Sequence, residues 1–221
     1  GPADLRRGAP EACVNEYGRI TRLVAKHARE AFRSQRECDA GWENLNFTAA
    51  PTFRRAGEDY DTFLTLLASE GAVIECLPDD PAVSLDAIYV RDASIVCEWG
   101  AILCAMGKPQ RSTEPAAQAR AFEALGVPVI GAITAPGKLE GGDVVWFDAH
   151  TVAVGRGYRT NDEGIRQFQQ ILGPEVDVLT VPLPHYRALL DFFGVGGRTI
   201  EREWPVQFRR ALDNALATAR P

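Results

Sequence analysis

The sequence predicts an α/β protein built from repeated modules, each with two strands, a helix and a further strand. Segments typical of strands and of helices alternate along the chain. The expected helices begin near Asp59, Ser112 and Asp162, so their starts are about 50 residues apart, as in a weak internal repeat. A pair of strands precedes each helix, and a plain doubly wound sheet lacks such pairs. Repeats of this size can close into a ring or propeller.

The helices are predicted from apolar spacing and from their end signals. They are expected over residues 59–70, 112–125 and 162–172. Gly71 and Gly126 follow the first two, as residues that tolerate a positive φ should. Glu114 lies in the first turn of the second helix, where an acidic group favours the helix dipole. Asn161 is a suitable cap for the third.

The strands are predicted from short apolar runs between turn signals. They are expected over residues 72–77, 88–90, 94–97, 101–104, 127–133, 143–147, 151–154 and 176–182. The segments 143–147 and 151–154 are predicted to form a hairpin. The ordered part is expected to begin within 14–24, and residues 43–54 are predicted to form a loop.

The composition is that of a globular protein, since 46% of the 221 residues are hydrophobic and 24% are charged. The net charge of −6 argues against nucleic acid as a partner, because phosphates favour a basic face. No apolar run approaches the roughly 18 residues that a membrane span needs, so no membrane partner is expected. Residues Gly1 to Asp4 do not have the pattern of a signal peptide, and the cytoplasm is the expected location.

The five cysteines predict neither a disulfide framework nor a metal site. They are odd in number, loosely spaced and without a CxxC pair. Buried free thiols, which pack like small apolar side chains, are the expectation. No metal and no cofactor is expected.

The segment 139–143 reads Leu-Glu-Gly-Gly-Asp at the entry to an expected strand. Glu140 and Asp143 flank two glycines, which permit close approach of a ligand. The alternative is a turn whose acids are solvated.

A second acidic segment surrounds the expected strand 88–90. Asp86 lies on the strand face of Ile88, and Asp92 follows at the end, where a side chain can turn into a site. The alternative is a supporting ion pair, either Arg91 with Asp92 or Asp86 with an arginine.

Residues 155–161 read Gly-Arg-Gly-Tyr-Arg-Thr-Asn, and Arg159 stands just before an expected helix. This pattern suits carboxylate binding, since Arg offers a bidentate fork and a helix start offers free N–H groups. The alternative is a surface loop with solvated Arg156 and Arg159.

Together these segments predict a site with two polarities. Its acids are Asp86, Asp92, Glu140 and Asp143. They can grip a guanidinium, whose five donors lie in one plane. Arg159 can hold the carboxylate of an amino acid. A ligand like arginine carries both groups.

Five strings, taken jointly, resemble the guanidino-group-modifying superfamily of amidinotransferases, arginine deiminases and dimethylarginine dimethylaminohydrolases. They are Val14–Arg19, Asp86–Ser94, Met106–Arg111, Leu139–Trp146 and Gly155–Gly164. The resemblance runs from about residue 13 to residue 187. It implies a pentein-like fold, a five-bladed α/β propeller with the site in its central channel. It also implies a Cys thiolate that attacks the guanidinium carbon, with a His as acid and base.

The resemblance implies roles for individual residues and an arginine or methylarginine ligand. Glu140 matches the acidic partner that orients the His or the substrate. Asp92 matches the carboxylate that binds the guanidinium, and Asp86 matches a nearby ligand. Arg159 matches an arginine that binds the substrate carboxylate.

The chain departs from the family pattern after Arg187. Gly194 stands where the family His is expected, and no cysteine follows Cys104, although the family nucleophile lies near the C-terminus. We therefore expect an incomplete propeller over residues 13–187, truncated or divergent in its C-terminal part. A flexible segment, 1–12, should precede it, and a divergent tail, 188–221, should follow with a non-family helix over Pro205–Ala217.

Three functions follow from these expectations. The first is a hydrolase or amidinotransferase of guanidino groups, which would need a second chain or an unrecognised nucleophile. The second is a pseudoenzyme that binds arginine-like ligands without turnover. The third is a scaffold or interaction protein, in which exposed strand edges allow a homodimer.

Overall fold

The computed structural model describes residues 16–182 and 201–210. The chain divides into two compact units, Gly1–Leu183 and Pro184–Pro221. In the second unit, residues 201–210 are helical, and the rest of the helix expected over Pro205–Ala217 lies outside the described residues. No helix in the described ranges has the length and apolar character that a membrane crossing requires.

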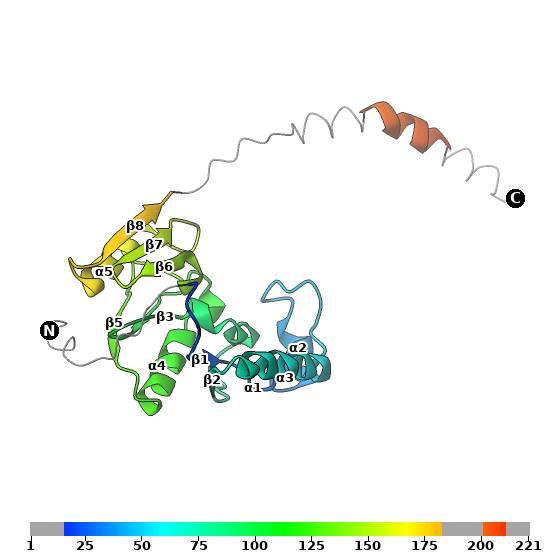
Figure 1. Ribbon diagram of the computed structural model, residues 1–221. Helices are drawn as coiled ribbons and strands as arrows, with labels where there is room; N and C mark the ends of the chain where they lie inside the picture. The colour runs from blue at the N-terminus through cyan, green and yellow to red at the C-terminus, as the bar shows by residue number, and fades with distance from the viewer. Residues whose placement is uncertain (1–15, 183–200, 211–221) are drawn as a thin grey trace, which may run out of the picture. The chain divides into compact units, whose positions relative to one another are not determined.

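Short strands and helices alternate in the first unit (Figure 1). The strands are β1 (Arg22–Ala25), β2 (Val73–Cys76), β3 (Ser94–Cys97), β4 (Gly100–Leu103), β5 (Val129–Ala132), β6 (Val144–Asp148), β7 (Thr151–Gly155) and β8 (Asp177–Val181). The α-helices are α1 (Ala28–Phe32), α2 (Gln35–Gly41), α3 (Phe53–Ser69), α4 (Glu114–Ala124) and α5 (Asp162–Leu172). This alternation confirms the α/β class.

Two of the three sheets have the same topology. β3 and β4 form an antiparallel hairpin, and β5 returns parallel to β4 after α4. β6 and β7 form a second hairpin, and β8 returns parallel to β7 after α5. The predicted hairpin is therefore confirmed as β6 with β7, and the predicted order of two strands, a helix and a strand is found in both modules.

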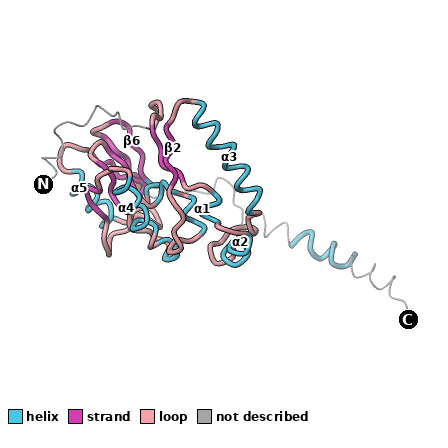
Figure 2. The backbone as a smooth tube through the Cα atoms, turned by 90° about the horizontal axis from the view of Figure 1, so that it is seen from below, coloured by secondary structure: helices cyan, strands magenta, loops and turns pink. Residues whose placement is uncertain are grey.

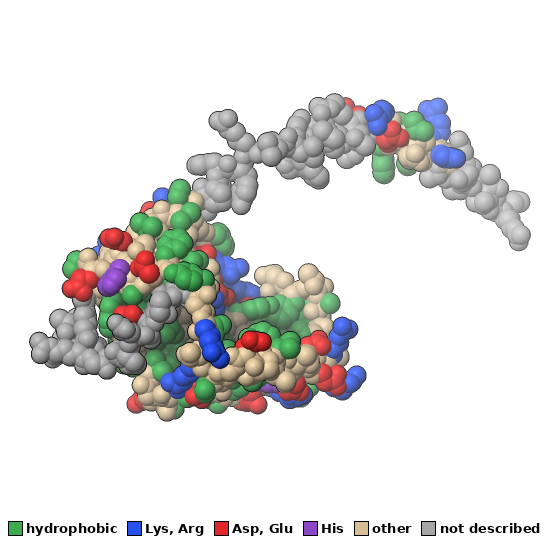
Figure 3. Space-filling view, viewed as in Figure 1, with side chains coloured by type: hydrophobic (Ala, Val, Ile, Leu, Met, Phe, Trp, Pro, Cys, Tyr) green, Lys and Arg blue, Asp and Glu red, His purple; other side chains and the backbone are tan. Residues whose placement is uncertain are grey.

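The first sheet is smaller. It contains β1 and β2 alone among the described residues, paired in parallel and separated in sequence by α1, α2 and α3. In Figure 2 the long helix α3 runs beside β2, with α1 and α2 at its other end. Ion pairs between residues four apart, Arg54 with Glu58 and Arg55 with Asp59, line the outer surface of α3. Figure 3 shows charged side chains of both signs in this region.

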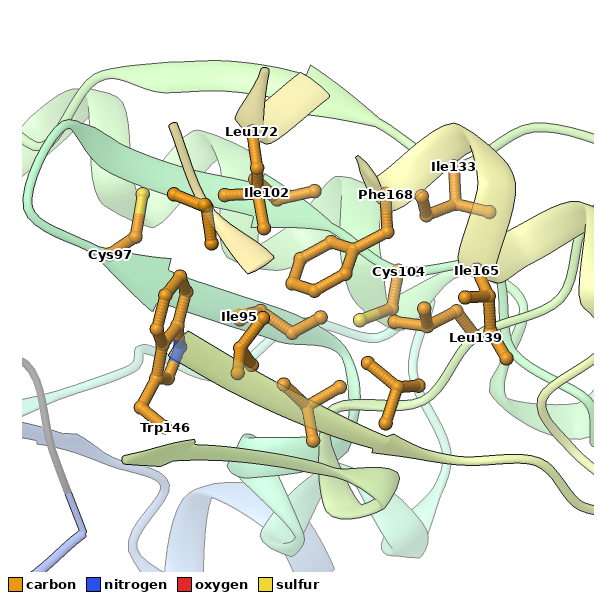
Figure 4. Close-up of a cluster of buried hydrophobic side chains, with 14 residues drawn as sticks. Ile95, Cys97, Ile102, Cys104, Ile133, Leu139, Trp146, Ile165, Phe168 and Leu172 are labelled. Atoms are coloured by element: carbon orange, nitrogen blue, oxygen red, sulfur yellow. The ribbon is translucent and has the colours of Figure 1, made fainter. Parts of the chain in front are cut away.

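The main apolar cluster, which we call the large core, joins the second and third sheets to α5 (Figure 4). Ile165, Phe168 and Leu172 form one face of α5, at the spacing of an amphipathic helix. Phe168 is fully buried and lies among side chains from both sheets, including Ile95 and Trp146. Truncating such a phenylalanine to alanine typically costs about 3–5 kcal/mol. The large core therefore holds the two modules together.

A second cluster, which we call the small core, lies under α1 and α3. Its buried members are Ala28, Ala31, Phe32, Cys38, Leu45 and Leu85. It shares no residue with the large core. The helices α1, α2 and α3 therefore pack around an apolar centre of their own.

The helix over residues 162–172 was predicted most accurately. α5 has the predicted bounds, and the side chain of Asn161 accepts a hydrogen bond from the backbone N–H of Gly164 at 2.8 Å. α4 lies inside its predicted range, and the predicted strands other than 88–90 end within one or two residues of the observed ones.

Two predictions about local structure were wrong. Residues 88–90 are not a strand, because Leu85–Ile88 and Val90–Asp92 form 3₁₀ turns, the first begun by the Ser84 hydroxyl accepting from the Asp86 N–H. Such local side-chain bonds compete with strand pairing. α3 begins at Phe53 inside the predicted loop 43–54, because Gln35 accepts from the Phe53 N–H at 2.8 Å. The helices α1 and α2 were not predicted.

Candidate functional site

A hollow of about 370 Å³ opens at the entry to the two hairpins. We call it the site hollow, and its lining residues are Asp92, Glu140, Gly142, Asp143, Tyr158 and Arg159. Asp92 ends the turn before β3, whereas Glu140 precedes the turn before β6 and Asp143 ends it. Arg159 comes from the loop between β7 and α5. The structure thus brings three of the four predicted acids and the predicted arginine together.

The paired glycines allow the two turns to touch. A Cβ on Gly141 would lie 2.1 Å from the backbone oxygen of Arg91, and a Cβ on Gly142 would lie 2.6 Å from Oδ1 of Asp92. Both distances are shorter than any normal contact of a Cβ atom. The glycines therefore serve a close approach between two modules, and that approach brings Asp92 beside Asp143.

Asp92 is held from behind by a buried arginine. Nη1 of Arg111 donates to Oδ2 of Asp92 at 2.6 Å. The same guanidinium donates from Nε and Nη2 to the two carboxylate oxygens of Glu114, at 2.9 and 2.8 Å. The side chains of Arg111 and Glu114 are 3% and 2% exposed, so this pair lies inside the protein. Burial raises the pKa of Glu114, and the hydrogen bonds from Arg111 oppose that rise.

Glu140 has a partner for each oxygen. Oε1 accepts from the backbone N–H of Gly107 at 2.9 Å, and Oε2 accepts from Nη1 of Arg159 at 3.2 Å. The side chain of Glu140 is 3% exposed, whereas that of Arg159 is 51% exposed. A buried carboxylate thus already holds a guanidinium at the wall of the site hollow.

Thr160 connects the remaining acid to this arrangement. Its hydroxyl donates to Oδ2 of Asp143 at 2.6 Å and accepts from the backbone N–H of Glu140 at 3.2 Å. Thr160 is fully buried. One threonine therefore fixes Asp143 and the backbone of Glu140 relative to each other.

Asp86 lies apart from the site hollow. Its buried carboxylate accepts from Nζ of Lys108 at 2.6 Å, and the same ammonium donates to the backbone oxygen of Leu45. The supporting pair that was the alternative for Asp86 is thus present, with a lysine as the partner. The other alternative, an ion pair of Arg91 with Asp92, is not formed, because Arg91 pairs with Glu16.

No described cysteine or histidine lines the site hollow. Cys104 is buried in the large core, and burial raises its pKa and that of Cys97, so both thiols are protonated at neutral pH. Gly194, the residue at the expected His position, lies outside the described residues. Among the described residues, no group of three or more His, Cys, Asp or Glu side chains is arranged to hold a metal ion.

Sequence reasoning missed the residues that hold the acids in place. Arg111, Glu114, Lys108 and Thr160 were not assigned to the site, although Arg111 ends one of the family-like strings. A usable signal was the spacing of Arg111 and Glu114, three positions apart at a helix start. The bonds from Arg111 to Asp92 and Tyr89 join distant segments and leave no local pattern.

Comparison with known proteins gives a consistent family assignment. Residues 84–192 match the arginine deiminase family. A dimethylarginine dimethylaminohydrolase of Streptomyces coelicolor is 34% identical over 128 residues, which are 57% of this chain and 48% of that protein. The enzyme of the same name from Pseudomonas aeruginosa is 28% identical over 122 residues, 55% of this chain and 47% of that protein. The chain thus spans about half the length of these curated relatives.

Solved structures show the same fold. A dimethylarginine dimethylaminohydrolase from Pseudomonas aeruginosa, crystallised as a cysteine-to-serine variant with citrulline, aligns with a TM-score of 0.61 at 23% identity. The alignment covers 76% of this chain and 63% of that one. The amidinotransferase SxtG from Microseira wollei aligns with a TM-score of 0.57 at 15% identity, over 76% of this chain and 62% of that one. At these identities the likeness concerns the fold.

Proposed function

We propose that this chain, which belongs to the guanidino-group-modifying superfamily, binds the guanidinium group of an arginine-like compound in the site hollow. The observation that carries the proposal is the lining, in which Asp92, Glu140 and Asp143 converge from two modules beside Arg159. A planar cation with five donors needs several acceptors at fixed angles. Three carboxylates held by internal partners meet that need.

The pair of Glu140 and Arg159 suggests how the ligand enters. Glu140 holds the Arg159 guanidinium at 3.2 Å, so its oxygen is already placed for a group of this shape. In our proposal the ligand guanidinium replaces Arg159 at Glu140. Arg159, which is about half exposed, then turns to the ligand carboxylate, for which its fork is suited.

For this chain alone we propose binding without turnover. The superfamily reaction needs a thiolate beside the guanidinium carbon. The described cysteines lie outside the site hollow, and burial keeps Cys97 and Cys104 protonated. The alternative, hydrolysis of arginine or methylarginine, predicts citrulline on incubation of the protein with either compound.

Titration calorimetry with L-arginine, NG,NG-dimethyl-L-arginine and guanidinoacetate tests the binding proposal. We expect heat from at least one compound and a roughly ten- to hundredfold weaker affinity for Asp92→Asn, the range for a lost hydrogen bond to a charged group. Asp59→Asn, an exposed change on α3, is the matched control. Absence of heat with all three compounds, or equal affinity of the two variants, would overturn the proposal.

Agmatine, which is arginine without its carboxylate, separates the two polarities of the site. Arg159→Ala should weaken the binding of arginine by about tenfold, because only arginine presents a carboxylate. It should not weaken the binding of agmatine, because the substitution also removes the guanidinium that occupies Glu140. If both ligands lose affinity equally, Arg159 has another role. A colorimetric citrulline assay on the same samples decides between binding and hydrolysis.

We also propose that the repeated modules belong to an α/β propeller whose channel holds the site. The shared topology of the second and third sheets supports this. A homodimer and a cytoplasmic location remain predictions from the sequence. Sedimentation analysis of the purified chain tests the first, and fractionation of cells tests the second.

A further inference from the structure

Glu114 does not line the site hollow, but the side chain of Arg111 connects it by hydrogen bonds to Asp92, which does. Glu114 lies in the first turn of α4 and is 2% exposed. Both of its oxygens are occupied by Nε and Nη2 of Arg111. This geometry is the bidentate fork, which fixes the plane of the guanidinium as well as its distance.

The remaining contacts of Arg111 follow from that plane. Nη2 also donates to the backbone oxygen of Tyr89 at 3.1 Å, and the guanidinium lies 5.8 Å from the centre of the Tyr89 ring. Nη1 is the group left to bond Asp92, at 2.6 Å. Glu114 thus determines where Arg111 meets Asp92.

Asp92 presents its two oxygens to different surroundings. Oδ2 faces Arg111, and Oδ1 faces Gly142 on the wall of the site hollow. Release of Oδ2 would leave the carboxylate free to rotate. The direction of Oδ1 toward the hollow therefore depends on Arg111.

A buried ion pair of this kind contributes little to stability that apolar side chains of similar volume could not replace. The pair does fix the orientation of the side chains it bonds, because the five donors of a guanidinium satisfy their partners in only one arrangement. We propose that Glu114 is a positioning residue, which acts through Arg111 to hold Asp92 with one oxygen aimed into the site hollow. This inference rests on the proposed function, in which Asp92 binds the guanidinium.

The first test needs no ligand. In ¹H–¹⁵N spectra, Nε–H of Arg111, assigned by its loss in Arg111→Lys, should give a slowly exchanging signal in the unmodified protein. The signal should persist in Asp92→Asn and disappear in Glu114→Gln. The reverse result, in which Asp92→Asn abolishes it and Glu114→Gln does not, would overturn the inference.

The second test uses arginine calorimetry. Glu114→Gln should weaken the binding of arginine by about tenfold, and Glu123→Gln, an exposed change on the same helix, should not. Because Glu114→Gln removes one of the two charge partners of the buried Arg111, the double variant Arg111→Met with Glu114→Met guards against misfolding. We expect it to fold and to bind as weakly as Glu114→Gln. Affinity equal to that of the unmodified protein in the folded double variant would refute the positioning role.

The two proposals fail in different ways. If the unmodified protein binds none of the guanidino compounds, the proposed function is wrong, and the Nε–H signals still decide whether Glu114 fixes Arg111. If the unmodified protein binds arginine and Glu114→Gln binds it equally well, the positioning role is wrong and the proposed function stands.

Discussion

Gly142 lies so close to Asp92 that a Cβ on the glycine would be 2.6 Å from Oδ1 of the carboxylate. Gly142→Ala should therefore displace Asp92 and weaken arginine binding by roughly tenfold, while the fold is kept because the displaced atom ends a side chain. Calorimetry measures the affinity, and circular dichroism checks the fold. Gly157→Ala is the matched control, since no atom lies within 4 Å of a Cβ there. Equal affinity of the two variants would contradict the expected displacement.

The N-cap side chain of α5 should contribute more to the free energy of unfolding than the N-cap side chain of α3. Asn161 accepts from the N–H groups of Gly164 and Lys138, at 2.8 and 2.9 Å. We expect Asn161→Ala to lower the free energy of unfolding by about 1–2 kcal/mol, measured by urea titration. Thr52, the N-cap of α3, makes no capping bond with its side chain, so Thr52→Ala should change it by less than about 0.5 kcal/mol. Similar losses in both variants would show that the Asn161 bonds are not the cause.

The contrast between these caps indicates what the sequence could predict. Asn161 and the apolar face of α5 act within one helix, so residues 161–172 were predicted with their bounds. α3 begins at Phe53 because Gln35 caps it from another helix, and no local pattern records that bond. The 3₁₀ turns around Asp86 were missed because the alternation of Ile88 and Val90 is typical of a strand.

The candidate site likewise has features that local sequence predicts and features that depend on distant partners. Asp92, Glu140, Asp143 and Arg159 were predicted from acids, glycines and an arginine at element ends, and they line one hollow. Asp86 was predicted from the same kind of signal, but its carboxylate is taken by Lys108. Partners that are distant in sequence decide which acids face a ligand, and a single sequence does not reveal them.

The cysteines should differ in reactivity according to burial. Cys76 is exposed, whereas Cys38, Cys97 and Cys104 are buried. Iodoacetamide should alkylate Cys76 in the native protein, faster at pH 9 than at pH 7, because partial desolvation of the thiol and nearby acids raise its pKa although the residue is exposed. The buried thiols should react only after unfolding. Peptide mapping by mass spectrometry measures the alkylation of each cysteine. If Cys104 in the native protein reacted as fast as Cys76, Cys104 would again be a candidate nucleophile.

The first turn of α5 carries a group with a strongly lowered pKa. Hydrogen bonds from Arg166 and Gln167 lower the pKa of Glu163 to about 2, from a usual value of 4.5. A lowered folded-state pKa means that the stability from this carboxylate is present above about pH 4.5 and is lost as the pH falls toward 2. Arg166→Gln should raise the pKa toward 4.5, as measured by ¹³C titration of the side chain. An unchanged titration would show that Arg166 does not cause the shift.

The two separate apolar clusters give residues 16–182 two apolar centres of different size. The large core has 14 buried members and the small core has 6, with none in common. Units of this kind can open independently, so amide protons in α1 and α3 should exchange with deuterium sooner than those in α5. Glu140 and Asp143 adjoin Leu139 and Val144 of the large core. The site hollow would then keep its shape while α1 and α3 unfold locally.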